Sequence, residues 1–256
     1  MKIEKIKKAG SKYKIVLDNG QIINTYEEVI INNGLLYHKY INDKLFEKIK
    51  TDNIYYKSYN KALNMINKRL RSEKEIKEYF LKAEVEEDDI EEIITSLKKI
   101  GLIDDKKFAV AYTNDKINLT NDGPYKIRKN LQANNIKEEY INEAINSLNK
   151  EIINEKIDKI IKRKVNSNTK YTPYMLKQKI LTYLINLGYN REDIIDRLEN
   201  TKIKNQDTTK EIEKLYNKLN KKYKEKELIY KLKNKLYSKG YSKEEIEDFI
   251  QKNSSY

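Results

Sequence analysis

Three windows of the chain repeat one apolar pattern at intervals of about fifty residues. Each window has apolar residues at offsets 0, 5, 10 and 14, and Asn or Gly at offset 4. The windows are residues 131–145, 184–198 and 236–250. Asn135, Gly188 and Gly240 hold the Asn or Gly position, where a helix can end in a left-handed residue. A fourth window, residues 81–94, fits if one residue is deleted at that stop.

A fixed period of this length is typical of repeat proteins, in which each unit packs against its neighbours. Two prolines and seven glycines in 256 residues favour helices joined by short connections. We therefore predict a mainly α fold of tandem three-helix repeats in an elongated, curved array, preceded by a small N-terminal module that contains a β-hairpin. The long surface of such an array suits a polymer or a filament.

The composition predicts a basic binding protein. Charged residues make up 36% of the chain and the formal net charge is +13, which favours an acidic partner such as nucleic acid. The absence of cysteine excludes disulfides and thiolate metal sites. No apolar run approaches the roughly 20 residues of a membrane-spanning helix. The first residues lack the apolar segment of a secretory signal, so we expect a cytoplasmic protein.

Residues 1–55 differ from the rest and predict an α+β module. Two β-branched stretches, residues 13–17 and 21–25, flank Asn19 and Gly20, and this is the strongest short-range signal of a hairpin. Short helices over residues 26–32 and 42–50 are expected to close the module.

Helix-start signals divide the remainder into predicted three-helix repeats at residues 56–103, 104–150, 151–203 and 204–256. Ser72 with Glu75, and Ser242 with Glu245, have the spacing of capping boxes. Asp104 is an expected N-cap, with Ile103 and Phe108 as a hydrophobic staple. Further helices are expected to begin at Gly123-Pro124 and Thr172-Pro173, where proline suits the first helical position.

No pattern in the chain predicts catalysis, a metal or a cofactor. His38 is the one histidine and is expected on the surface or in packing. The acidic run from Glu84 to Glu92 lacks the spacing of a calcium loop. Most of it falls in the first turns of a helix predicted over residues 87–99, where the helix dipole favours carboxylates. Glycine-rich phosphate loops and nucleophile elbows are also absent from the sequence.

Basic residues recur at one position of the first helix in the first three predicted repeats. Arg69, Lys116 and Lys164 each follow an apolar pair by four residues. Such residues either form solvated helix faces or display a basic row to an anionic partner. Residues 150–256 hold 26 Lys and Arg against 16 Asp and Glu, so we expect the C-terminal half to make most of any contact with an anionic polymer.

Several motifs resemble the RecX family, the bacterial regulators of the RecA recombinase, in its longer form with an N-terminal extension. The motifs are Ala62-Leu63 with Arg69, Arg71-Ser72-Glu73-x-Glu75-Ile76, Gly101-Leu-Ile-Asp104-Asp105-x-x-Phe108-Ala109, and Gly123 with Ile127, Leu131 and Ile136. The resemblance covers essentially the whole chain and is strongest over residues 62–131. In RecX proteins the second helix of a unit usually ends in Lys/Arg-Gly. The first repeat reads Lys82-Ala-Glu-Val85 instead, and the second has Asn135.

The resemblance implies a negative modulator that binds RecA, or the groove of the RecA–single-stranded DNA filament. Such a protein inhibits recombinase, ATPase and co-protease activities by steric and electrostatic blocking, or caps filament growth, without a cofactor. We expect a monomer with weak direct DNA binding. The expected contact residues are Arg69, Arg71, Lys116, Arg128, Lys129, Arg163 and Lys164.

Two other functions stay open on the sequence alone. One is a sequence-nonspecific nucleic-acid-binding helical repeat protein without a recombinase partner. The other is an adaptor that docks a different protein through the N-terminal module.

Overall fold

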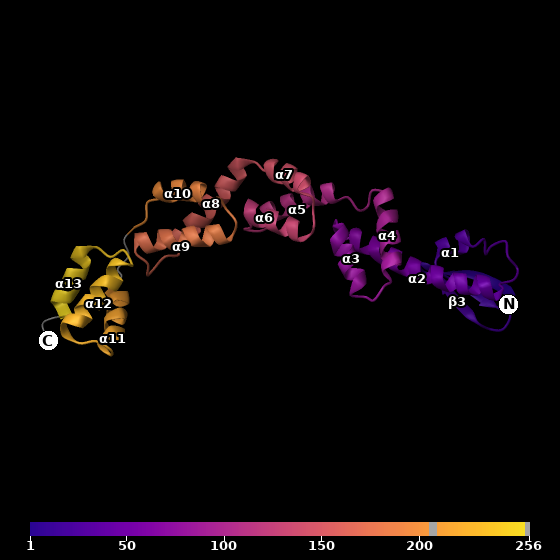
Figure 1. Ribbon diagram of the computed structural model, residues 1–256, viewed down its shortest axis with the longest axis horizontal. Coiled ribbons are helices and arrows are strands. Elements are labelled where there is room, and N and C mark those ends of the chain that lie inside the picture. Colours follow the sequence, from indigo (N-terminus) through magenta and orange to yellow (C-terminus); the bar gives the residue numbers. More distant parts are fainter. Residues whose placement is uncertain (205–208, 254–256) are drawn as a thin grey trace. The chain divides into compact units, whose positions relative to one another are not determined.

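The computed structural model describes residues 1–204 and 209–253, over which the chain is mainly helical, with three strands and 13 helices (Figure 1). The strands are β1 (Ile3–Ala9), β2 (Lys12–Leu17) and β3 (Ile22–Thr25). The helices are α1 (Glu27–Asn32), α2 (Asp43–Ile66), α3 (Glu73–Leu81), α4 (Glu87–Lys99), α5 (Asp105–Leu119), α6 (Pro124–Ala133), α7 (Glu138–Asn146), α8 (Lys150–Asn166), α9 (Pro173–Asn186), α10 (Arg191–Glu199), α11 (Thr209–Asn220), α12 (Glu225–Tyr237) and α13 (Lys243–Asn253). The predicted fold class, a mainly α chain of three-helix units behind a β-containing module, is confirmed.

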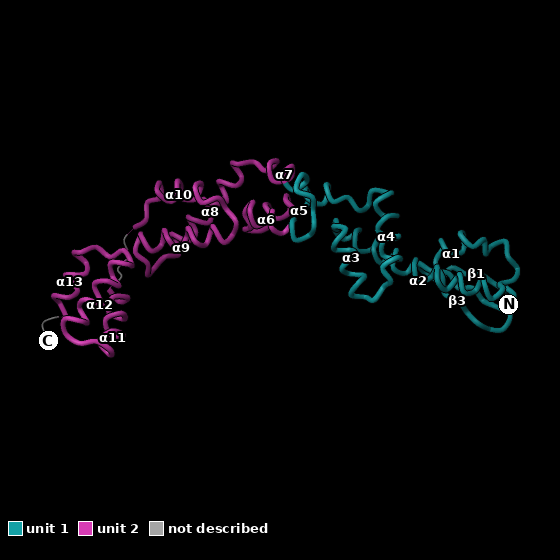
Figure 2. The backbone as a smooth tube through the Cα atoms, viewed as in Figure 1, with its two compact units in different colours: residues 1–111, 131–141 teal, residues 112–130, 142–256 magenta. Residues whose placement is uncertain are grey.

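The chain forms two compact units (Figure 2). The first contains residues 1–111 and 131–141, and the second contains residues 112–130 and 142–256. Helices α5, α6 and α7 therefore contribute residues to both units. The predicted fourth repeat includes residues 205–208 and 254–256, which lie outside the described residues. Within the described ranges, no helix is both long and apolar enough to cross a membrane.

The N-terminal module is built on an antiparallel sheet of order β1-β2-β3. The predicted hairpin is confirmed: β2 pairs with β3, and Gly20 has φ +81° in the turn between them. Strand β1 was not predicted. Its side chains are exposed except for the half-buried Ile3 and Ile6, so it shows no alternation of apolar and polar residues. Backbone pairing with β2, from Ile3 opposite Leu17 to Ala9 opposite Lys12, holds it in the sheet.

Helix α2 joins the module to the first three-helix unit. The sequence predicted one helix over residues 42–50 and a new start near Tyr56, which is wrong: α2 is a single helix of 24 residues. Its first half packs in the module core around Ile49, and its second half buries Ala62 and Ile66 in the core of the first unit. The apolar stripe changes face between these cores, and no Gly or Pro interrupts the helix, so one continuous helix serves both.

The repeated sequence pattern corresponds to one repeated backbone turn. Helices α3, α6, α9 and α12 are each followed by a left-handed residue. The residue after it donates its N–H to the carbonyl five positions earlier, which satisfies a carbonyl at the helix end. The left-handed residues are Glu84, Asn135, Gly188 and Gly240, with φ of 56°, 58°, 89° and 76°. The hydrogen bonds are Val85 to Phe80, Ile136 to Leu131, Tyr189 to Leu184 and Tyr241 to Leu236, at 3.1, 3.2, 3.1 and 3.2 Å.

The first copy of the pattern needs no deletion, which corrects the sequence alignment. Phe80, at 2% exposure, takes the leading apolar position, whereas Leu81 is 41% exposed. Counting from Phe80, the offsets 5, 10 and 14 fall on Val85, Ile90 and Ile94. The glycine missing from this repeat is replaced by Glu84, which adopts the left-handed conformation at a cost of about 1–2 kcal/mol. Because a glutamate is not expected at a left-handed position, the first copy of the pattern was placed one residue too late in the sequence, at Leu81 instead of Phe80.

The predicted caps are largely confirmed. Ser242 and Glu245 form a reciprocal capping box, with hydrogen bonds of 3.1 and 2.7 Å. Ser72 accepts from the Glu75 N–H at 3.1 Å, but the Glu75 carboxylate binds Arg69 instead of returning to Ser72. Asp104 caps α5 by accepting from the Lys107 N–H at 3.0 Å.

Asp105, the neighbour of Asp104, has a different partner. Its carboxylate accepts from the backbone N–H of Glu73 at the start of α3, at 3.1 Å. Burial raises the pKa of the Asp105 carboxyl, whereas the Lys107 backbone hydrogen bond lowers the pKa of Asp104. Both aspartates therefore have structural roles at helix starts, and the sequence predicted this role for Asp104.

The second helix of one repeat begins where the second helix of the next repeat ends. Ser72 donates to Asn134 Oδ1 at 3.2 Å, and Thr172 donates to Lys239 O at 2.7 Å. Between them in sequence, the Gly123 N–H donates to Leu187 O at 2.6 Å. In these joints the start of one helix lies at the end of another, which aligns their dipoles favourably. The Gly123 bond satisfies a backbone N–H of one helix start and a backbone carbonyl of the other helix end, whereas the bonds of Ser72 and Thr172 are donated by side-chain hydroxyls.

Candidate nucleic-acid interface

The structure pairs the two predicted contact residues of the first repeat with one carboxylate. Arg69 donates to both oxygens of Glu75, at 2.9 and 2.7 Å. Arg71 lies 3.9 Å from the same carboxylate and donates to Met65 O at 3.4 Å. A bidentate pair of this geometry compensates the arginine charge locally. Arg69 and Arg71 therefore stabilise the start of α3 through Glu75.

The next three predicted residues lie on α5 and α6. Lys116 Nζ lies 5.3 Å from the ring centroid of Tyr112. Arg128 donates to Asn142 Oδ1 at 2.6 Å, and Lys129 is exposed. Their three side chains do not share the hollow described next, so the structure does not bring all seven predicted residues together.

The last two predicted residues, Arg163 and Lys164, occupy the final turn of α8 and line different hollows. Lys164 lines a hollow of about 650 Å³ that is formed by the end of α8, the loop of residues 167–172 and α9. We call it the α8–α9 hollow. Arg163 lines a more open hollow of about 500 Å³ with Lys159 and Lys162. Ser167 lines both hollows. Cations at the end of α8 are also favoured by its dipole.

The α8–α9 hollow combines cations, aromatic rings and neutral polar groups. Its cations are Lys164, Lys170 and Lys179, and its rings are Tyr171 and Tyr183. The remaining lining residues are Ser167, Asn168, Thr169, Leu176, Gln178, Ile180, Thr182 and Asn186. No Asp or Glu lines it, so the wall of the hollow is positively charged.

Each of the three ammonium groups lies over a tyrosine ring. Lys164 Nζ is 4.2 Å from the Tyr183 centroid, and Lys179 and Lys170 are 4.7 and 5.4 Å from that of Tyr171. A cation–π contact at an exposed site stabilises by about 0.5–1 kcal/mol and leaves the positive charge in place. The pKa of Glu211 is lowered mainly by its hydrogen bond with Lys214, with a smaller contribution from Lys170.

Buried polar contacts hold the loop that carries two of these residues. Asn168 is 8% exposed and donates from Nδ2 to Tyr171 O at 2.8 Å. Its Oδ1 accepts from the N–H groups of Lys170 and Tyr171 at 3.4 and 3.0 Å. Thr172 then caps α9 through the Met175 N–H at 3.3 Å. The loop is therefore fixed before any ligand binds.

Lys170, Lys179, Tyr171 and Tyr183 were not predicted from the sequence. One signal was available: Lys179 and Tyr183 are four residues apart on α9 and share a helix face. The contribution of the loop had no such signal, because it depends on Asn168 folding the chain back beside α9.

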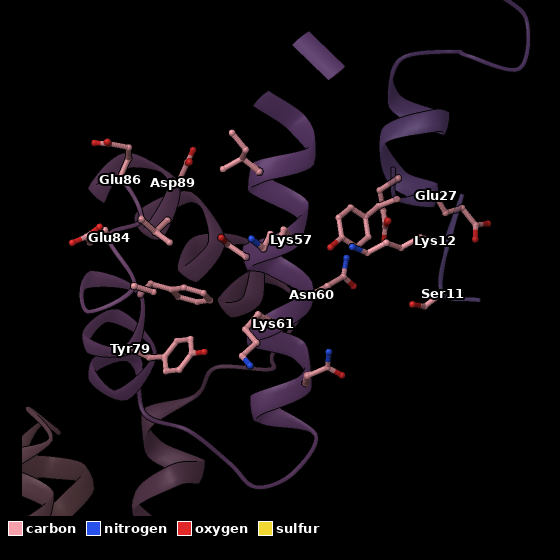
Figure 3. Close-up of a pocket in the computed structure, with 18 residues that line it drawn as sticks. Ser11, Lys12, Glu27, Lys57, Asn60, Lys61, Tyr79, Glu84, Glu86 and Asp89 are labelled. Atoms are coloured by element: carbon pink, nitrogen blue, oxygen red, sulfur yellow. The ribbon is translucent and has the colours of Figure 1, made fainter. Parts of the chain in front are cut away.

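A larger hollow in the first unit has mixed charge. It measures about 1000 Å³ and is lined by the N-terminal module, α2 and the start of α4. Figure 3 shows Glu84, Glu86 and Asp89 on one side, with Lys57 and Lys61 projecting from α2. Carboxylates in its lining would repel an anionic polymer. Although it is larger than the α8–α9 hollow, it is therefore the less suitable interface for nucleic acid. Over the described part of the chain, no cluster of three His, Cys, Asp or Glu residues fits a metal, and His38 is exposed.

Two family models match the chain. The model described as RecX, first three-helix domain, matches residues 59–97, and that described as RecX, second three-helix domain, matches residues 104–145. Proteins named regulatory protein RecX are similar along nearly the full length. The one from Listeria monocytogenes serotype 4b is 32% identical over 99% of this chain and 97% of its own. The one from Bacillus cytotoxicus is 32% identical over 98% and 96%.

Solved structures agree with these matches. A crystal structure of regulatory protein RecX has a TM-score of 0.62 and 25% identity, covering 78% of this chain and all of its own. A crystal structure of RecX from Lactobacillus salivarius has a TM-score of 0.50 and 28% identity, covering 57% and 97%.

Proposed function

The chain belongs to the RecX family of regulatory proteins, and from this premise we propose that it is a negative modulator of the RecA recombinase. The matched relatives are regulatory proteins, and the chain is a regulator rather than an enzyme. Its proposed partners are RecA and the RecA–single-stranded DNA filament. We place it in the cytoplasm as a monomer.

The proposed mechanism is steric and electrostatic blocking of the filament groove. A repeat protein that lies in the groove hinders strand exchange, ATP hydrolysis and the co-protease reaction without chemistry of its own. The observation that carries the electrostatic part is the α8–α9 hollow, where three lysines converge and no carboxylate lines the wall. The excess of Lys and Arg over residues 150–256 supports the same assignment.

We propose Arg163 and Lys164 as the first filament contacts. Both lie at hollows lined by further lysines, in the part of the chain with the greatest positive charge. The other proposed contacts are Arg69, Arg71, Lys116, Arg128 and Lys129. Arg69 has to leave Glu75 before it reaches a phosphate, which reduces the gain from binding.

A charge-reversal pair tests this assignment. Arg163→Glu with Lys164→Glu is expected to weaken sedimentation of the protein with preformed RecA filaments. The matched control is Lys221→Glu with Lys222→Glu, two adjacent exposed residues that give the same change of net charge. Equal loss in both variants would indicate a general charge effect. Unchanged binding of the first variant would remove Arg163 and Lys164 from the interface.

A second function is favoured by the same hollow: sequence-nonspecific binding of nucleic acid without a recombinase partner. A cationic groove with aromatic walls is typical of proteins that bind single strands on their own. This function predicts that naked DNA binds the protein as tightly as the filament does. The modulator function predicts that the filament binds more tightly than RecA or DNA alone.

A further inference from the structure

We propose that the α8–α9 hollow is a specific site for single-stranded DNA, in which one unstacked base lies on Tyr183 and the flanking phosphates bind Lys164 and Lys179. This inference rests on the proposed function for the choice of DNA as the polymer. It adds a residue-level site and a preference for single strands over duplex.

The charge of the hollow is available to a ligand. Other cations of the described chain form ion pairs with a carboxylate on the same or a neighbouring helix, as Lys159 does with Glu155 and Arg197 does with Asp158. The ion pairs of the described residues include none for Lys164, Lys170 or Lys179. Their ammonium groups contact the neutral rings of Tyr171 and Tyr183, and Lys170 also interacts electrostatically with Glu211, which lies outside the hollow. A phosphodiester entering the hollow therefore meets ammonium groups without first breaking an ion pair.

Binding of a phosphate also makes the Tyr183 ring available to a base. Lys164 covers Tyr183 at 4.2 Å only while no anion competes for the ammonium. When the ammonium turns toward a phosphate, the ring is uncovered and a base can stack on it. Tyr183 is suited to this because it is half-buried and packs against the core that contains Leu184 and Ile180. The ring is thus a rigid wall, and stacking on it requires little ordering.

A duplex cannot use the rings, because neighbouring base pairs cover the faces of its bases. A single strand presents those faces, and aromatic stacking is the usual way in which proteins hold it without reading sequence. Gln178 and Asn186 offer neutral donors and acceptors in the same hollow. The combination therefore favours single strands of mixed sequence.

The strand has a continuation on the other side of α8. Ser167 lines both the α8–α9 hollow and the hollow of Lys162 and Arg163. A backbone that crosses the last turn of α8 at Ser167 passes from one group of cations to the other. The site is accordingly expected to span more than one nucleotide.

The absence of tryptophan from the chain allows a direct test of stacking. In the full-length Tyr183→Trp variant, a 20-nucleotide oligo(dT) is expected to quench the tryptophan fluorescence. Inorganic polyphosphate and a 20-base-pair duplex, at equal phosphate concentration, are expected to bind with little quenching. Tyr223→Trp is the control, since Tyr223 also lies beneath a lysine, Lys231 at 5.7 Å, but outside the hollow. Oligo(dT) binding that quenches both positions equally, or neither, would overturn the proposal.

Affinities give a second, independent readout. Tyr183→Leu is expected to weaken oligo(dT) binding by roughly 5- to 150-fold, the range for losing one stacked base, and to leave duplex binding unchanged. Lys164→Gln with Lys179→Gln is expected to weaken both and to reduce the salt slope for oligo(dT) by about 1.4. Tyr223→Leu and Lys231→Gln are the matched controls. Equal losses for single strand and duplex in Tyr183→Leu would contradict stacking.

These measurements contain no RecA, so they test the DNA site independently of the proposed function. If wild-type protein inhibits RecA but the hollow variants bind DNA normally, inhibition runs through protein contacts and the site proposal is wrong. If the hollow behaves as described but RecA is unaffected, the nucleic-acid-binding function replaces the modulator.

Discussion

The joint between α6 and α9 depends on Gly188, and Gly188→Ala is predicted to open it. A Cβ at this position lies 2.4 Å from Lys126 N and 2.7 Å from Lys126 Cβ, so the two helix ends have to separate. The backbone at φ +89° adds about 1 kcal/mol of strain for any other residue. Separation breaks the bonds of the Gly123 and Tyr125 N–H groups to Leu187 O and Gly188 O, at 2.6 and 2.9 Å. Two such bonds contribute about 1–3 kcal/mol together.

The expected cost of Gly188→Ala is therefore about 2–4 kcal/mol. Gly101→Ala is the matched control. Gly101 also follows a helix, at φ +73°, but a Cβ there has no atom within 4 Å, so its cost is about 1 kcal/mol of strain alone.

Amide hydrogen exchange measures the joint locally. Because 1.4 kcal/mol is a factor of ten, the difference of about 1–3 kcal/mol predicts exchange at Gly123 and Tyr125 that is roughly 5- to 150-fold faster in Gly188→Ala than in Gly101→Ala. Equal exchange in the two variants would refute the argument that close helix approach, and not only backbone conformation, requires glycine here.

The remaining predictions concern the core, one cap and one buried hydroxyl. Phe80→Ala is expected to cost about 3–5 kcal/mol and Leu81→Ala under about 1 kcal/mol, because only Phe80 is buried; comparable urea midpoints for the two would contradict the corrected alignment. The Lys107 backbone N–H lowers the pKa of Asp104, so this carboxylate stabilises the fold at pH values above its unfolded pKa, and the contribution is lost as the pH falls through the folded pKa. In a pH series of unfolding curves, Asp104→Asn should therefore reduce the loss of stability at acid pH. Burial raises the pKa of the Asp105 carboxyl, so its effect on stability depends on pH in the opposite direction. Its stabilising contribution is present below the unfolded pKa and is lost as the pH rises through the folded pKa. Burial also raises the pKa of Tyr189 to about 12, and its hydroxyl is buried without a hydrogen-bond partner among the described residues. Tyr189→Phe should therefore leave the free energy of unfolding unchanged or raise it by up to about 1 kcal/mol in thermal unfolding. A clear loss of stability would show that the hydroxyl has a hydrogen-bond partner in solution.

The sequence predicted those parts of the fold that depend on short-range signals. The repeat windows correspond to the turns at Asn135, Gly188 and Gly240, and the helix predicted over about residues 87–99 is observed as α4. The prediction was wrong where tertiary context decides. Glu84 fills a left-handed position through the packing of Phe80 and Val85, and α2 continues through residues 50–56 because two cores hold its two halves.

The candidate site was only partly predictable for the same reason. Helical periodicity identified Arg163 and Lys164 as exposed residues near an apolar stripe. It did not indicate that Glu75 engages Arg69 and Arg71, because that contact joins the segment between α2 and α3 to the first turn of α3. Nor did it indicate that Asn168 folds a loop onto α9 and brings Lys170 and Tyr171 opposite Lys179. Spacing within one helix predicts a face, whereas a groove between segments depends on how they pack.

The most direct test of the central claim is the single-stranded-DNA-dependent ATPase of RecA with this protein titrated in, beside binding of the protein to the same DNA without RecA. A filament regulator is predicted to inhibit at concentrations well below those that coat the bare DNA. Inhibition that appears only once the DNA is saturated would contradict the account, since simple competition for DNA would then explain it.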